Sequence, residues 1–173
     1  METLKPASSR DWAELAATLG RWLLGGLFVY MGLRKALEPF RFLELVHAYG
    51  MVGNPYLLNA IAAALPWFET FCGLLLLAGV AVRGTALMLI LMLVPFTLLI
   101  LQRAFAIAAA KNISFWIVKF DCGCGAGEVI IWQKMIENSL LILLACWLLS
   151  GHGRRLAARF ALMPEAEATI GNL

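Results

Sequence analysis

The sequence predicts an all-α integral membrane protein, a four-transmembrane-helix bundle with short interfacial helices. Hydrophobic residues make up 62% of the 173 residues and charged residues only 14%. A soluble domain of this length cannot bury so much apolar surface. The apolar residues also gather into four runs, and each run is long enough for a helix to cross a hydrocarbon layer of about 30 Å.

These runs divide the chain into three parts. Residues 1–18 form a polar or interfacial N-terminal segment, residues 19–150 form the transmembrane domain, and residues 151–173 form a polar C-terminal tail. The four predicted spans cover, in order, residues 19–37, 60–82, 85–110 and 129–150.

The connections between the spans differ in length. Pro39 ends the first helix because proline cannot continue the backbone hydrogen-bond ladder. Arg83-Gly84 permits only a tight turn, so the second and third spans should be antiparallel neighbours. The two longer connections, residues 40–59 and 112–120, are predicted to be short amphipathic segments at the membrane surface.

Glycines in the first span and a proline in the third predict local features of helix packing and shape. Gly25, Gly26 and Gly32 in the first span provide faces at which another helix can approach closely. Pro95 removes a backbone donor from the third span and predicts a kink there.

The positions of the basic residues indicate how the chain is oriented in the membrane. They do not indicate nucleic-acid binding. The net charge is +3, but the basic residues stand singly or in pairs beside apolar runs, as membrane-flanking charges do. Lysine and arginine are equally frequent on the two sides of the predicted bundle. The juxtamembrane cluster of Arg154, Arg155 and Arg159 favours cytoplasmic termini. The first and third connections would then be extracytoplasmic.

The turn Lys119–Gly127 carries Cys122 and Cys124 among three glycines. Two thiols one residue apart can form a disulfide only with strain, and strain makes the bond easier to reduce. The backbone N–H groups of a glycine-rich turn, together with Lys119, favour a thiolate. The turn also falls on the predicted oxidising side of the membrane. The pattern therefore favours a redox-active pair.

Two other interpretations of this pair stay open. It could be a structural disulfide that fixes the turn, or it could be half of a metal site. Ligands for zinc are scarce because Cys72 and Cys146 lie inside apolar spans. A copper(I) site of Cys122, Cys124 and His47 is the remaining metal alternative, and no metal is expected otherwise.

Polar side chains within the spans predict a second feature beneath the cysteine turn. An ionisable group in the bilayer costs about 2.5 kcal/mol or more and usually faces the bundle interior. Glu69 lies in the second span, and Lys134, Glu137 and Asn138 share one face of the fourth. Together they predict either a quinone or proton site or simple interhelical contacts. Lys35 belongs to the same predicted path, although a lysine at a helix end also snorkels to the interface.

Several motifs carry a resemblance to a known family. The first span ends in Gly32-Leu33-Arg34-Lys35, the second contains Pro66-Trp67-Phe68-Glu69, and Asp121-Cys122-Gly123-Cys124-Gly125 precedes Trp132. On these motifs the sequence resembles the DoxX-like superfamily of four-helix bacterial membrane proteins. Within that superfamily it is most similar to the MauE-type branch, which is associated with methylamine utilisation. The resemblance covers most of residues 19–150.

This resemblance implies a multi-pass protein of the bacterial inner membrane that works in thiol or sulfur redox chemistry. MauE-type proteins are associated with thioredoxin-like partners that mature disulfide-containing periplasmic enzymes, and DoxX-type proteins with thiosulfate- or quinone-linked oxidation. Only Cys122 and Cys124 take a redox role from the family. The chain departs from the family at Gly125-Ala126-Gly127, where an aromatic residue is common, and at Glu137-Asn138, where an Arg-Asn pair is expected.

The sequence therefore predicts a membrane thiol-disulfide or sulfur redox protein. Its Cys122–Cys124 pair would exchange electrons between an extracytoplasmic thioredoxin-like partner, or a sulfur compound, and membrane quinone. The alternative is a non-catalytic accessory subunit of a larger membrane complex, in which the pair is a structural disulfide or a metal site. Both interpretations stay open from the sequence, and with them the question whether the protein is an enzyme.

Overall fold

Four long helices form the structure and confirm the predicted fold class. The computed structural model describes residues 9–50, 53–123 and 127–150. The four helices that are long and apolar enough to cross a bilayer are α1 (Ser9–Leu37), α3 (Pro55–Ala78), α4 (Val82–Lys111) and α5 (Ile131–Leu149). The first long connection contains the short helix α2 (Pro39–Ala48), and the second contains the 3-10 helix η1 (Phe115–Ile117).

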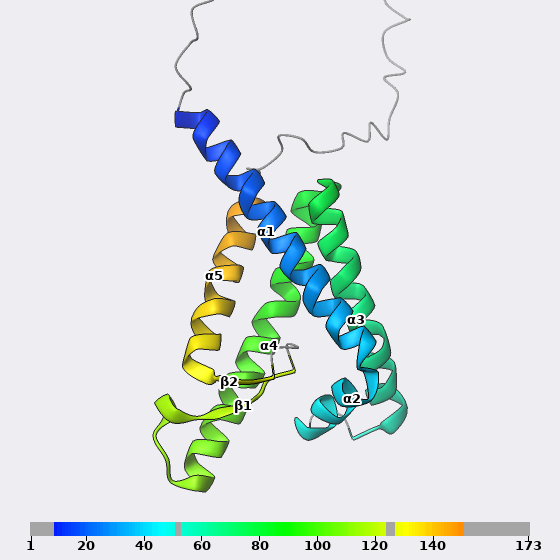
Figure 1. Ribbon diagram of the computed structural model, residues 1–173, viewed down its shortest axis with the longest axis vertical. Coiled ribbons are helices and arrows are strands. Elements are labelled where there is room, and N and C mark those ends of the chain that lie inside the picture. The colour runs from blue at the N-terminus through cyan, green and yellow to red at the C-terminus, as the bar shows by residue number, and fades with distance from the viewer. Residues whose placement is uncertain (1–8, 51–52, 124–126, 151–173) are drawn as a thin grey trace, which may run out of the picture.

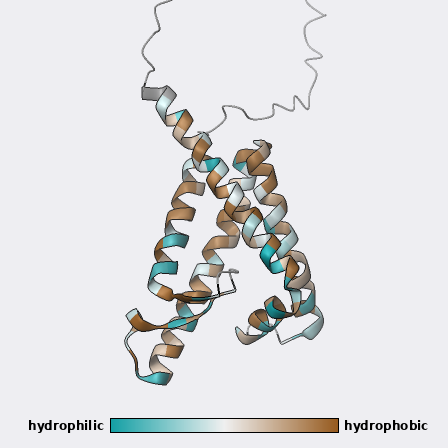
Figure 2. Cartoon of the chain, viewed as in Figure 1, coloured by the Kyte–Doolittle hydropathy of each residue, from teal (hydrophilic) through white to brown (hydrophobic). Residues whose placement is uncertain are grey.

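The four long helices pack as two antiparallel pairs, α1 with α3 and α4 with α5. The pairs meet around Ala17, Val82 and Leu148 and diverge toward the other end, which carries α2 and a small hairpin (Figure 1). Hydrophobic residues cover most of the four helices, and hydrophilic residues are more frequent toward the α2 end (Figure 2). The start of α1 and the end of α5 thus lie on the same side of the bundle, as an even number of spans requires.

The helix ends follow local signals in the sequence. Asn54 caps α3, because its side-chain oxygen accepts hydrogen bonds from the backbone N–H groups of Tyr56 (2.9 Å) and Leu57 (3.4 Å). This cap places the start of α3 at Pro55, earlier than the predicted residue 60. Gly79, with φ of +72°, ends the same helix in the left-handed conformation that glycine adopts without strain.

The first helix begins earlier than the first predicted span. It starts at Ser9 and continues without interruption into the apolar run, so residues 9–18 extend the helix. Ala17 and Thr18 are already buried against the bundle. The predicted C-terminal tail, residues 151–173, lies outside the described residues.

A two-stranded hairpin holds the cysteine turn, and it was not predicted from the sequence. Strand β1 (Lys119–Asp121) pairs antiparallel with β2 (Glu128–Ile130), so that Phe120 lies opposite Val129. Gly123 and Gly127, at the two ends of the turn, both have φ of +79°. The predicted glycine-rich turn therefore closes a short sheet that leads directly into α5.

Close backbone contact holds α1 against α3. A Cβ atom on Gly73 would lie 2.7 Å from the backbone oxygen of Gly25, and one on Gly32 would lie 2.7 Å from that of Pro66. Real Cβ atoms essentially never come so close to backbone. Two of the three predicted small-residue positions, Gly25 and Gly32, are thus at a helix contact, whereas a Cβ atom on Gly26 would meet nothing within 4 Å.

Two of the helices contain an internal proline. Pro66 lies inside α3 and Pro95 inside α4, and each helix continues past its proline. A threonine hydroxyl donates to a backbone oxygen one turn before it in both places, from Thr70 to Pro66 (2.8 Å) and from Thr97 to Leu93 (2.7 Å). These bonds supply extra backbone partners close to each proline.

We expect Gly73→Ala to destabilise the bundle and Gly26→Ala to leave it stable. Overpacking at Gly73 should lower the free energy of unfolding by about 1–3 kcal/mol, because the added methyl group meets the α1 backbone. At Gly26 the better helix propensity of alanine should give no loss. Thermal unfolding in detergent, followed by circular dichroism, checks both variants. Equal stability of the two variants would contradict the close packing of α1 and α3.

Candidate functional site

A largely apolar cavity of about 320 Å³ lies where the two helix pairs diverge. It lies between two clusters of buried residues. It shares Phe28 and Leu93 with the cluster at which the pairs meet, and it shares Cys122 with the cluster beneath the hairpin. Its volume is in the range of small-ligand sites in proteins. All four long helices, α2 and the cysteine turn contribute side chains to its wall.

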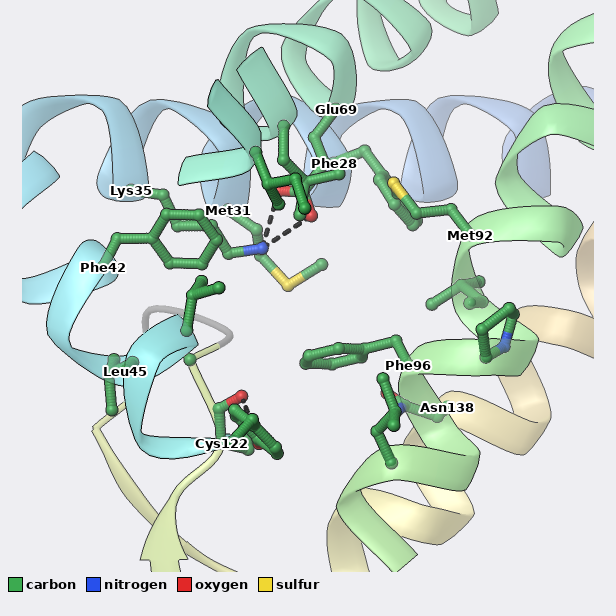
Figure 3. Close-up of a pocket in the computed structure, with 18 of the residues that line it drawn as sticks. Phe28, Met31, Lys35, Phe42, Leu45, Glu69, Met92, Phe96, Cys122 and Asn138 are labelled. Carbon is green, nitrogen blue, oxygen red and sulfur yellow. Dashed lines mark hydrogen bonds and ion pairs between the residues drawn. The ribbon is translucent and has the colours of Figure 1, made fainter. Parts of the chain in front are cut away.

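The strongest polar interaction in this wall joins Lys35 of α1 to Glu69 of α3. The Lys35 Nζ donates to both carboxylate oxygens, at 2.6 and 2.7 Å, and both side chains are only 6% exposed. The same ammonium lies 5.4 Å from the ring centre of Phe42 and 6.0 Å from that of Phe96. Lys35 therefore points into the bundle, as Figure 3 shows, and does not snorkel to the interface.

Helix α5 brings two of its three predicted polar residues to the cavity. Lys134 and Asn138 line the wall and are buried, and the Asn138 amide donates to the Thr97 hydroxyl of α4 at 3.1 Å. Glu137 lies outside the cavity wall. Its side chain is 62% exposed and accepts a hydrogen bond from Lys134 at 2.9 Å. The i, i+3, i+4 spacing predicted one shared face for the three residues. In the structure, Lys134 and Asn138 point to the cavity and Glu137 points away from it.

Cys122 lies across the cavity from Glu69 (Figure 3). Its side chain is fully buried, and its backbone oxygen accepts a hydrogen bond from the Tyr49 hydroxyl at 3.1 Å. In the same turn, the Asp121 carboxylate accepts a hydrogen bond from the Gly123 N–H at 3.0 Å. Cys124 lies outside the described residues. The structure thus brings one predicted redox cysteine to the cavity that also holds Lys35 and Glu69.

Polar contacts fasten α2 to the hairpin and to α4. Arg41 of α2 forms salt bridges with Asp121 at 3.0 Å and with Glu38 at 3.3 Å. These contacts raise the pKa of Arg41, and the hydrogen bond to Asp121 contributes most. Arg103 of α4 donates to the Ala48 backbone oxygen at the end of α2.

Arg103 also lies over two aromatic rings at this junction. Its guanidinium carbon is 4.9 Å from the ring centre of Tyr49 and 5.6 Å from that of Phe120. Arg41, Tyr49 and Arg103 were not predicted as site residues. Their positions next to the cysteine turn arise only when the two connections meet in space.

The remaining candidates lie away from the cavity. His47 is exposed and does not belong to the cavity wall. Cys72 is buried in the core where the helix pairs meet, and Cys146 is exposed on α5. Within residues 9–50, 53–123 and 127–150, no three His, Cys, Asp or Glu side chains lie close enough to hold a metal ion. The copper alternative includes Cys124 and therefore stays a prediction.

The site combines an apolar chamber with hydrogen-bond donors on one side and the buried cysteine on the other. An ammonium has three N–H donors, and Glu69 accepts from Lys35 in two hydrogen bonds. The carboxylate balances the charge, so a neutral ligand with acceptor oxygens suits the chamber better than an ion does. Such a ligand would lie between the acid–base pair and the cysteine turn.

Comparison with known proteins identifies one family. The family model described as Methylamine utilisation protein MauE matches residues 13–151, which include most of α1 and all of α3, α4 and α5. No curated protein and no solved structure matches the chain. The wider resemblance to DoxX-like proteins stays a prediction.

We expect loss of one partner of the Lys35–Glu69 pair to destabilise the protein more than loss of an exposed partner does. Glu69→Leu leaves a buried ammonium without its counter-charge and should cost about 3–5 kcal/mol. Adding Lys35→Met should recover most of this loss. Glu137→Gln is the matched control, because it affects a half-exposed pair worth about 1 kcal/mol or less. Denaturant unfolding in detergent measures all three, and equal losses for Glu69→Leu and Glu137→Gln would contradict the burial of the pair.

Proposed function

The chain belongs to the MauE family of methylamine utilisation membrane proteins, and we propose that it is a membrane thiol-disulfide redox protein. In this proposal Cys122 and Cys124 alternate between disulfide and dithiol. They take electrons from an extracytoplasmic thioredoxin-like protein and pass them to membrane quinone. The hairpin would face the outside of the bacterial inner membrane, and the termini would be cytoplasmic.

The observation that carries this proposal is the shared cavity of Cys122 and the Lys35–Glu69 pair. Cys122 forms part of the wall of an apolar chamber that also contains an ammonium, a carboxylate and the Asn138 amide. A purely structural clip requires no chamber next to it. A dithiol that reduces a quinone requires space beside the sulfur and donors that hydrogen-bond the quinone oxygens.

Each half-reaction moves two electrons. A thiolate of the partner attacks the Cys122–Cys124 disulfide and forms a mixed disulfide, and the second partner thiol then displaces it. The partner leaves with its own disulfide, and Cys122 and Cys124 remain as thiols. The dithiol then gives two electrons and two protons to a quinone, which leaves as the quinol while the Cys122–Cys124 bond forms again.

The polar side chains of the cavity would orient the quinone and move its protons. The Lys35 ammonium and the Asn138 amide, both in the cavity wall, would donate hydrogen bonds to the quinone oxygens. Glu69 keeps Lys35 in place through two hydrogen bonds and balances its charge in the low-dielectric interior. Lys134 of the cavity wall donates a hydrogen bond to Glu137, which is exposed on α5. The two side chains thus connect the cavity to the outer face of that helix.

We expect Cys122→Ser and Cys124→Ser to abolish electron transfer from a dithiol protein to quinone. The reason is that neither variant can form the disulfide. Cys146→Ser is the control and should retain activity, because Cys146 is exposed and does not belong to the cavity wall. Quinol formation in nanodiscs, with reduced thioredoxin as the donor, provides the measurement. Unchanged rates in both cysteine variants would overturn the proposal.

A redox titration separates this function from the structural alternative. Mass-shift alkylation of Cys122 and Cys124 should reveal a reversible two-electron couple above about −250 mV, as labile catalytic disulfides have. A pair that resists reduction below about −300 mV, or one metal ion per chain, would instead indicate an accessory subunit with a structural clip or a metal site.

A further inference from the structure

The cavity wall is tight on one side of the bundle and open on another. The wall residues contributed by α1 and α5 include almost fully buried ones, with Phe28 at 1%, Lys134 at 7% and Asn138 at 2% exposure. Where α3 faces α4, Leu91 of the wall is 58% exposed and Leu65 is part-exposed. The cavity therefore reaches the outer surface between α3 and α4.

This opening has an apolar lining and would face the hydrocarbon layer of a bilayer. Its residues repeat at helical spacing on the two facing helices, namely Ile61 and Leu65 on α3 and Leu91, Pro95 and Leu99 on α4. All five lie within helices that are apolar and long enough to span a membrane. We call this set the α3–α4 portal.

The end of the cavity beneath α2 is much narrower. Phe42 and Leu45 of α2 cover it, and the Arg41–Asp121 bridge ties α2 to the hairpin. A small crevice of about 20 Å³ lies there, next to Lys35 and Gly123. That volume holds about one water molecule. A ligand as large as a quinone ring cannot pass through this crevice.

We propose that the α3–α4 portal admits a long-tailed quinone directly from the bilayer, with its ring at Lys35 and Asn138 and its tail between α3 and α4. This inference rests on the proposed function and names the form of its electron acceptor. The proposed donors, Lys35 and Asn138, are buried in the wall, whereas the α3–α4 portal is apolar. The occupant must therefore carry its acceptor oxygens at one end and hydrocarbon at the other.

The α3–α4 portal predicts that affinity depends on the tail of the ligand. In nanodiscs, a decyl-substituted benzoquinone should bind the wild-type protein at least tenfold more tightly than the same quinone without the tail, with empty nanodiscs as the reference. Leu91→Trp should narrow the portal and remove most of that advantage, while the tail-less quinone keeps its affinity within about twofold. Isothermal titration calorimetry measures both ligands.

Two further variants make the test specific. Leu98→Trp places the same bulk on the exposed face of α4 but outside the cavity wall, so it should change neither affinity. Asn138→Leu removes a donor at the inner end and should weaken both ligands by a similar factor. If Leu91→Trp does not fold, Ile61→Trp tests the same opening from α3.

The results separate the portal from the redox function. Equal binding of the two quinones by the wild-type protein, no binding of either, or equal loss of both in Leu91→Trp would overturn the α3–α4 portal. A reversible cysteine couple without tail-dependent binding would leave the thiol chemistry standing and reject the portal. Tail-dependent binding with cysteines that do not cycle would keep the portal and reject the redox function.

Discussion

The Lys35–Glu69 ion pair is the interaction on which the rest of the structure depends. Either charge alone within the membrane-spanning region would cost about 2.5 kcal/mol or more, so each requires the other. Their contact fixes α1 against α3, and the close approach at Gly25 and Gly73 makes that position possible. The pair must also be enclosed, and Phe42 of α2 covers it from the side of the connection.

Helix α2 links this ion pair to the cysteine turn. At one edge it covers Lys35, and at the other the Tyr49 hydroxyl reaches the backbone of Cys122. Arg41 and Arg103 hold the helix against the hairpin and against α4. A change in the conformation of the cysteine turn would therefore shift α2, and a shift of α2 would change the wall of the cavity. This continuity is the physical basis for considering the cysteine and the ion pair as one site.

Much of the architecture could be predicted from local features of the chain. Apolar run lengths located the four spans, because a segment of about 20 apolar residues can satisfy its own backbone hydrogen bonds inside a bilayer as a helix. The turn at Cys122 and the inward orientation of Glu69 also followed from residue types alone, since a glycine-rich turn and a charge in the membrane both have few explanations. The hairpin around the turn was missed because three-residue strands leave no periodic signal.

The sequence by itself determined the spans, the turns and the need of each buried charge for a partner. Only the tertiary structure decided which partner each charge has. Lys35 could snorkel or turn inward, and it turns inward because Glu69 of another helix lies opposite it. Glu137 could face the cavity or the surroundings, and the rotation of α5 against α4 turns it outward. The cavity and its opening likewise exist because the two helix pairs diverge. Their divergence depends on how the helices pack together, so it cannot be predicted from any one segment of the sequence.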